Sequence, residues 1–145
     1  MLEAVGHAGL RPFFKACHDA LLPGGSAVIQ VITIPDRKYN AYRYSSDWIR
    51  KHIFPGGHLP SMGAMKTAVS QTSDLRLDDV QGYAADYATT LQRWRQTLLE
   101  KQQEIKTMGF DDAFIRKWEY YFAYCHAGFR AEIIDLVQMV LNKPE

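Results

Sequence analysis

Cysteine is scarce in this 145-residue chain, which has only Cys17 and Cys125. The two lie far apart and fit neither a Cys-x-x-Cys motif nor a Cys/His metal spacing, so the sequence predicts no disulfide framework and no metal site. Both thiols are expected to be buried in a reducing, cytoplasmic compartment. No stretch approaches the run of about 18 apolar residues typical of a membrane span, and the first residues lack the basic and apolar regions of a signal peptide. We therefore expect the chain to be soluble.

Neither sign of charge is in excess, because 17 Lys and Arg stand against 16 Asp and Glu. A net charge of +1 creates no field that would attract nucleic acid, so no nucleic-acid partner is expected. Nucleotide-binding loops are absent as well: Gly24-Gly25 and Gly56-Gly57 are isolated pairs typical of turns, and no G-x-G-x-x-G, P-loop, HExxH or G-x-S-x-G motif occurs.

What is present is a globular composition, with 47% hydrophobic and 23% charged residues. Residues 10–21 have the i, i+3, i+4, i+7 apolar spacing of an amphipathic helix, which Pro23-Gly24-Gly25 ends. Residues 26–34, SAVIQVITI, are nearly all apolar and typical of a strand covered on both faces in a parallel sheet. Such a strand needs neighbours on both sides, and none precedes it, so we expect further strands upstream of Met1.

The rest of the chain alternates helical and strand patterns, which indicates one α/β domain over residues 1–145. The first predicted elements are a short helix from Pro60 to about Val69 and a half-exposed strand over 75–80. A long charged helix follows, with apolar positions from Leu91 to Met108, and ends near Gly109. The next helix starts after Asp111 or Asp112 and runs to Phe129, and a closing strand covers 136–141. Residues 35–72 are interpreted as an inserted helical lid on the substrate side.

Seven strings occur in an order that is similar to a known family: MLEAVG, LLPGG, SAVIQVITIPD, HIFPGGHLPS, DYATTLQRWR, GFDDAFIRKWEYYFAYCHAGFR and DLVQMVL. The chain resembles the cyclopropane-fatty-acyl-phospholipid synthase family from the fourth strand of that family's sheet to its end. The resemblance implies the C-terminal half of a Rossmann-like class I methyltransferase sheet with an antiparallel last strand. It also implies that the glycine-rich loop for S-adenosyl-L-methionine lies upstream of Met1, so no cofactor-binding residue is expected within the chain.

The resemblance further implies that a methyl group from S-adenosylmethionine is transferred to a cis double bond of a lipid acyl chain. The resulting carbocation loses a proton as the ring closes, with a bicarbonate ion as base. The family's anion-site residues carry over to Glu3, Gln30, Ile32 and Tyr121 as catalytic residues. From sequence alone, Glu3 also fits a solvated carboxylate, and Tyr121 fits a core residue of an apolar helix face.

Gln30 departs from the histidine that many members of the family have. An amide donates a hydrogen bond but cannot share a titrating proton near neutral pH. Either the anion site works with an amide donor, or the cation is quenched differently, with a methyl-branched product after hydride reduction as one outcome. The alternative is a structural role, because a glutamine inside a buried strand needs a hydrogen-bond partner.

The stretch 85–130 is rich in aromatic residues and is interpreted as the helical acyl-pocket region. The predicted substrate-binding residues are Tyr87, Trp94, Trp118 and Phe122; an ordinary aromatic core explains them equally well. Basic residues of the lid fit either anionic phospholipid headgroups or a solvated helix face: Arg37, Lys38, Arg43, Arg50 and Lys51.

The expected partners are unsaturated phospholipid acyl chains, with peripheral contact to a membrane and self-association through an exposed sheet edge. Since the cofactor site is expected elsewhere, we expect this chain alone to be inactive. Two further hypotheses stay open at this point. The chain fits a non-catalytic truncated product or lipid-binding module, and it also fits a methyltransferase of the same fold that acts on a small amine or a sterol.

Overall fold

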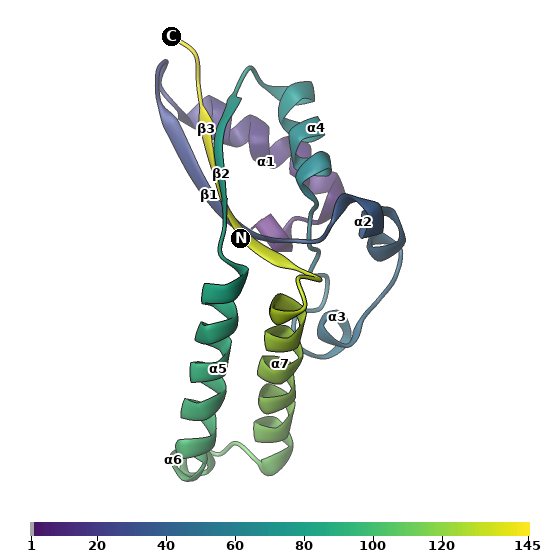
Figure 1. Cartoon of the computed structure of the whole chain (residues 1–145), viewed down its shortest axis with the longest axis vertical. Helices are drawn as coiled ribbons and strands as arrows, with labels where there is room; N and C mark the ends of the chain where they lie inside the picture. Colours follow the sequence, from purple (N-terminus) through teal and green to yellow (C-terminus); the bar gives the residue numbers. More distant parts are fainter. Residues whose placement is uncertain (1) are drawn as a thin grey trace. The chain divides into compact units, whose positions relative to one another are not determined.

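The computed structural model describes residues 2–145 (Figure 1). The chain forms two compact units, of which the first runs to Tyr83 and resumes at Ile134–Glu145, and the second comprises Ala84–Ile133. Each unit is described by itself.

The first unit contains a three-stranded sheet of β1 (Ser26–Thr33), β2 (Arg76–Gly82) and β3 (Asp135–Asn142) in the order β1-β3-β2. β3 is antiparallel to both neighbours, as predicted for the last strand. The expectation that residues 26–34 are covered on both faces was wrong, because Val28 on β1 is 67% exposed. An apolar, β-branched run favours a strand but does not identify its partner or its degree of burial.

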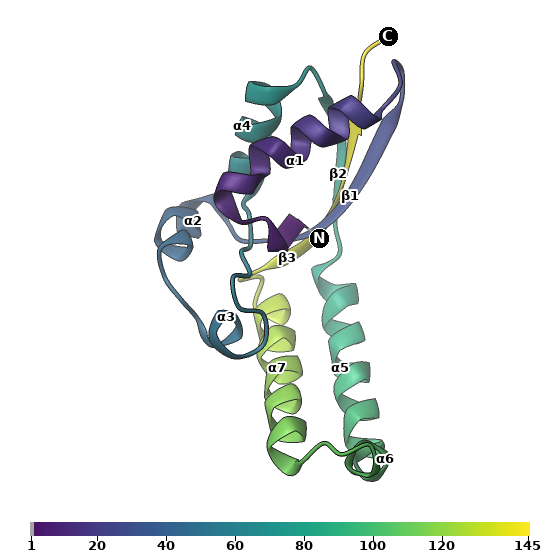
Figure 2. The same ribbon diagram turned by 180° about the vertical axis from the view of Figure 1, so that it is seen from behind.

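Two helices cover one face of this sheet, α1 (Gly6–Ala20) and α4 (Met62–Thr72) (Figures 1 and 2). Their buried side chains pack with those of alternate strand residues, as the twofold periodicity of strands requires. The core cluster consists of Leu2, Leu10, Phe14, Val31, Met65, Ala68, Val69, Leu75, Val137, Met139 and Leu141. The helix predicted over 10–21 is thus confirmed, with its start four residues earlier at Gly6.

The chain between β1 and α4 forms two short helices, α2 (Asp36–Arg43) and α3 (Trp48–His52). The side chain of Asp47 accepts a hydrogen bond from the Arg50 N–H at 2.8 Å and begins α3 as its N-cap. The short 3-10 helix η1 (Leu2–Ala4) precedes α1.

The second unit is a helical hairpin of α5 (Ala84–Glu100), α6 (Gln102–Thr107) and α7 (Asp112–Arg130). Its fully buried residues are Ala88, Leu91, Ile115, Cys125 and Phe129. The single long helix predicted to end near Gly109 is broken at Lys101, where neither glycine nor proline signals a break. Asp111 caps α7, as predicted, because its Oδ1 accepts from the Phe114 N–H at 2.8 Å.

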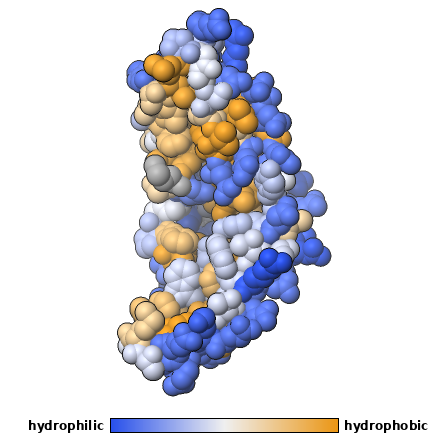
Figure 3. All heavy atoms as spheres, turned by 90° about the vertical axis from the view of Figure 1, so that its left-hand side faces the viewer, coloured by the Kyte–Doolittle hydropathy of each residue, from blue (hydrophilic) through white to orange (hydrophobic). Residues whose placement is uncertain are grey.

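The surface is mixed in polarity (Figure 3). One apolar patch in that view lies at the α6 end of the hairpin, near which Met108 is 73% exposed and Phe110 is 43% exposed. Within residues 2–145, no helix combines the length and apolar character needed to cross a membrane. Cys125 is buried, whereas Cys17 is only half-buried, and both are free thiols.

Candidate functional site

Glu3 is held at the carboxyl end of β1. Its Oε1 accepts a hydrogen bond from the backbone N–H of Ile32 at 2.9 Å, and its backbone carbonyl accepts from the N–H of His58 at 2.8 Å. The carboxylate is half-buried. The structure therefore joins two of the residues predicted for the anion site, and it fixes Glu3 through both its side chain and its backbone.

Gln30 lies on the same face of β1 as Ile32, since the two are alternate residues of one strand. The expectation that Gln30 is buried was wrong, because its side chain is exposed. Its Oε1 accepts from Nε2 of Gln138, the residue opposite it on β3, at 3.0 Å. Its own amide N–H groups form no hydrogen bond within the described part of the chain, so they remain available as donors on this face.

Tyr121, the fourth predicted residue, is on α7 in the second unit and is half-buried. Its ring lies edge-on to Trp118, with centroids 5.4 Å apart, and 5.4 Å from Phe122. The predicted catalytic residues are thus divided between the units, with Glu3, Gln30 and Ile32 in the first and Tyr121 in the second.

The four predicted substrate-binding residues belong to one chain of ring contacts in the hairpin. Tyr87 contacts Trp94 at 6.0 Å between centroids, Trp94 contacts Phe122 at 6.1 Å, and Phe122 contacts Trp118 at 5.9 Å. These rings are half-buried or exposed, and Trp94 is 47% exposed. They are distinct from the fully buried core of the hairpin, so parts of their faces stay accessible to a ligand.

A polar network in the first unit, between His7, Tyr39, His58 and Arg43, was not predicted from the sequence. The Tyr39 hydroxyl lies 2.9 Å from Nε2 of the buried His58 and 2.7 Å from Nδ1 of His7. Nε2 of His7 lies 2.9 Å from a terminal nitrogen of Arg43. The residues come from α1, α2 and the α3–α4 connection, and no sequence spacing links them.

The direction of these hydrogen bonds follows from the chemistry of arginine, which has only donors. Nε2 of His7 must accept from Arg43, so a neutral His7 has its proton on Nδ1 and donates to the Tyr39 oxygen. The Tyr39 hydroxyl then donates to Nε2 of His58. The network runs from Arg43 through His7 and Tyr39 and therefore ends on a neutral His58, whose Nε2 accepts. The backbone N–H of His58 in turn donates to the backbone carbonyl of Glu3.

Burial and nearby cations make protonation of both histidines unfavourable. Burial is the main cause that lowers the pKa of His58, followed by Arg50, His7 and Arg43. The pKa of His7 is lowered first by desolvation and then by Arg43 and Arg11. Burial also raises the pKa of Tyr39, which keeps the hydroxyl protonated and able to donate.

Acidification is expected to destabilise the protein through these histidines. Their folded pKa values lie below the ordinary value of 6.5, so below that pH the unfolded chain binds more protons than the folded chain. The free energy of unfolding should be constant above about pH 6.5 and fall as the pH drops further. Urea denaturation across this range measures the effect. His58→Gln should flatten the slope, whereas the exposed control Lys51→Gln should keep it; an unchanged slope in His58→Gln would contradict the assignment.

No group of three or more His, Cys, Asp or Glu side chains within residues 2–145 is arranged to hold a metal ion.

Comparison with known proteins places these residues in a family. The family model described as mycolic acid cyclopropane synthetase matches residues 1–139. Tuberculostearic acid methyltransferase UfaA1 of Mycobacterium tuberculosis is 40% identical over 141 residues, which cover 97% of this chain and 33% of that protein. Cyclopropane-fatty-acyl-phospholipid synthase of Escherichia coli K12 is 32% identical over 143 residues, which cover 99% of this chain and 36% of that protein.

Solved structures show the same relation. The cyclopropane synthase MmaA2 from Mycobacterium tuberculosis superposes with a TM-score of 0.86 at 26% identity, over 98% of this chain and 52% of that one. The mycolic acid cyclopropane synthase CmaA1, solved with SAH and CTAB, gives a TM-score of 0.87 at 25% identity with the same coverage. The chain thus spans about a third of the length of the two sequence relatives and about half of the length of these solved chains.

Proposed function

Because this chain belongs to the mycolic acid cyclopropane synthetase family of S-adenosylmethionine-dependent methyltransferases, we propose that it is the acceptor-side part of such an enzyme, acting on double bonds of lipid acyl chains. The observation that carries the proposal is the family match along residues 1–139. The predicted α/β fold of a class I methyltransferase is confirmed by the structural likeness to MmaA2 and CmaA1.

The acceptor in this proposal is an unsaturated acyl chain of a phospholipid. One relative is named a cyclopropane-fatty-acyl-phospholipid synthase and another a tuberculostearic acid methyltransferase, so a ring and a methyl branch are both consistent products. Ring closure requires the cation to lose a proton, which the Gln30 amide does not take up near neutral pH, whereas a saturated branch requires a hydride from a separate reductant. Product analysis by mass spectrometry distinguishes the two.

S-adenosylmethionine, when bound, would supply the methyl group for the double bond. Glu3 contributes a fixed negative charge close to the positive charge that develops on the acceptor, where a preorganised group is most effective. The hydroxyl of Tyr121 contributes a hydrogen-bond donor. Tyr87, Trp94, Trp118 and Phe122 line the acyl chain, each methylene of which gains about 0.8 kcal/mol on burial. Their ring faces favour a cation by about 0.5–2 kcal/mol.

A bicarbonate ion beside Glu3 is part of the proposal, and the donors of this chain fit it in part. The amide N–H groups of Gln30 are available, but the Ile32 N–H already donates to Glu3. Of the residues predicted for this site in the first unit, Gln30 therefore has the donors left for the anion.

The lid and the membrane contact are proposals as well. Residues 35–72, which contain α2, α3 and α4, are proposed to cover the substrate side, and residues 85–130 are proposed to form the acyl pocket. Peripheral contact with a membrane is supported by the exposed Met108 and Phe110 at the end of the hairpin. Self-association through β1 is supported by its place at the end of the strand order.

Calorimetry tests whether the cofactor is bound mainly outside these residues. We expect no measurable binding of S-adenosylmethionine to the 145-residue chain, because it lacks a glycine-rich loop. A version that also has the upstream length of the relatives should bind in the micromolar range or more tightly. Micromolar binding by the short chain would refute the assignment of the cofactor site. A failure of the longer version to modify phospholipid would favour a lipid-binding module, or a different acceptor such as an amine or a sterol.

A further inference from the structure

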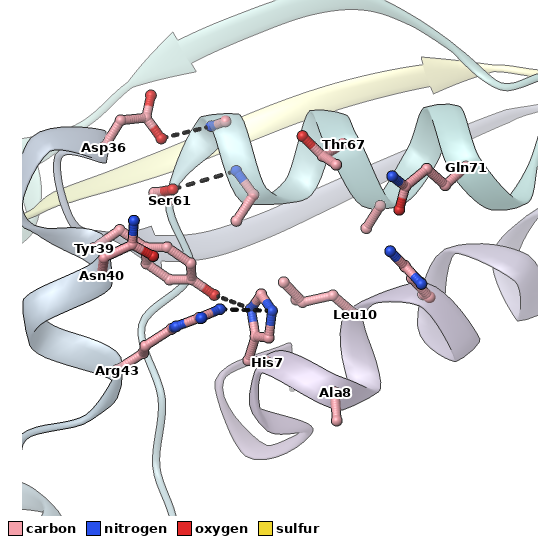
Figure 4. Close-up of a pocket in the computed structure, with 14 residues that line it drawn as sticks. His7, Ala8, Leu10, Asp36, Tyr39, Asn40, Arg43, Ser61, Thr67 and Gln71 are labelled. Atoms are coloured by element: carbon pink, nitrogen blue, oxygen red, sulfur yellow. Dashed lines mark hydrogen bonds between the residues drawn. The ribbon is translucent and has the colours of Figure 1, made fainter.

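A cleft of about 630 Å³ opens in the first unit between α1, α2 and α4 (Figure 4). In this view His7 and Leu10 come from α1, Asn40 and Arg43 from α2, and Thr67 and Gln71 from α4. Arg11 also lines the cleft. The volume lies in the range of about 300–1,000 Å³ that is typical of pockets for small organic molecules.

The charged side chains of the cleft are mainly positive. Arg11 and Arg43 contribute two guanidinium groups, and both lower the pKa of His7, which lies beside them. The acidic residue of the lining, Asp36, offsets one of these two charges, and its Oδ1 accepts from the N–H of Gly63 at 2.8 Å, at the start of α4. The cleft therefore offers an unneutralised positive charge to a ligand.

Both guanidinium groups have unused donors. Within residues 2–145 the exposed Arg11 forms no hydrogen bond or ion pair, and Nε of Arg43 is buried without a hydrogen-bond partner among them. The terminal nitrogens of Arg43 are held by His7 and the Tyr44 hydroxyl, with its guanidinium 4.5 Å from the centre of the Tyr44 ring. Arg43 is thus preorganised by the network that continues to Tyr39 and His58, while Arg11 remains free to close on a ligand.

The remaining lining indicates what accompanies the anion. Asn40, Thr67 and Gln71 add neutral amide and hydroxyl groups, which suit hydroxyl or ester oxygens. Leu10 and the small residues Ala64 and Ala68 form the apolar part of the cleft wall. Two guanidinium groups from different helices offer more donors than the two oxygens of one carboxylate need, whereas a phosphate presents more oxygens in several directions.

We propose that this cleft is a binding site for a phosphate oxyanion carried on a small organic group, with the glycerophosphate headgroup of a phospholipid as its source. The choice of a lipid as the source rests on the proposed function; the binding of a phosphate does not. The cleft lies in the same unit as Glu3, and His7 connects it to the residue that holds Glu3 in place. Headgroup and acyl chain would then be recognised by separate parts of the protein.

The test is calorimetric titration of the 145-residue chain with three probes: inorganic phosphate, glycerol 3-phosphate and glycerophosphoglycerol, a water-soluble phosphodiester without acyl chains. We expect the diester to bind and Arg11→Gln to weaken it about tenfold or more, as expected for loss of a charged hydrogen-bond donor. Lys15→Gln is the matched control, because it removes the same charge from the exposed face of α1 outside the cleft, and should bind like the wild type.

Each outcome decides the proposal. Binding of the diester that Arg11→Gln weakens and Lys15→Gln does not supports it. Binding of inorganic phosphate alone would overturn the phospholipid headgroup as the source. Equal affinity in the two variants, or no binding of any probe, would overturn the proposal that this cleft binds a phosphate. Since Arg43 also contacts His7, Arg43→Gln is used only after circular dichroism shows an unchanged fold. No probe contains an acyl chain or the cofactor, so the result is independent of the methyltransferase assay.

Discussion

Replacing Glu3 by glutamine is expected to lower turnover on phospholipid by about 100-fold or more, the range for loss of a preorganised group that stabilises developing charge. The variant is measured in a version of the protein that also has the upstream length of the relatives. Glutamine keeps an oxygen that can accept from the Ile32 N–H, at 2.9 Å in the present structure, so the substitution removes the charge and leaves the position. A loss of rate therefore reports the electrostatic role of the carboxylate rather than a loss of structure.

The control for this variant is Glu104→Gln on α6, which makes the same change at an exposed carboxylate paired with Lys101. Its turnover should equal that of the wild type. The dissociation constant for S-adenosylmethionine, measured by calorimetry, should be the same in all three proteins. Wild-type turnover in Glu3→Gln would show that the family's anion-site role does not extend to this residue.

Replacing Tyr121 by phenylalanine is expected to lower turnover by about 10- to 100-fold, because a hydrogen bond to a charged group contributes about 1.5–3 kcal/mol. The ring contacts of Tyr121 with Trp118 and Phe122 are retained by phenylalanine, so packing of the hairpin should change little. The rate is measured as for Glu3, with single-turnover kinetics to separate chemistry from product release.

Tyr120→Phe is the matched control on the same helix. Tyr120 is 49% exposed and stacks on Tyr124, one turn further along. The Tyr120→Phe variant should have the same turnover rate as the wild type. If the two tyrosine variants have the same rate, Tyr121 is a packing residue only, which is the plainer interpretation of an aromatic residue on an apolar helix face.

The two units differ in how much of their structure sequence patterns could predict. In the hairpin, Asp111 was identified as a candidate cap and Gly109 as a stop, and both are local: the cap bonds three residues away, and Gly109 has a φ of 95°, which favours glycine. The break at Lys101 could not be predicted in this way, since the apolar spacing continues across it.

In the first unit, the functional geometry depends on contacts between distant segments. The bond from Ile32 to Glu3 crosses 29 positions of the chain, and the bond between His7 and Tyr39 crosses 32. Family resemblance led to Glu3 and Ile32, although nothing in their spacing predicts a direct bond between them. Gln30 was expected to be buried but is exposed, because the apolar residues around it in the sequence do not tell which groups cover its face of the strand.

The sequence by itself determined the α/β class, the start of α7 and the family, because capping, periodicity and long motifs are read from neighbouring residues. Only the tertiary structure decided that His58 is a neutral acceptor next to Glu3, that Gln30 is paired with Gln138, and that Arg11 and Arg43 line one cleft. The physical reason is that burial, hydrogen-bond direction and local charge depend on groups brought together from separate helices and strands, which no local pattern records.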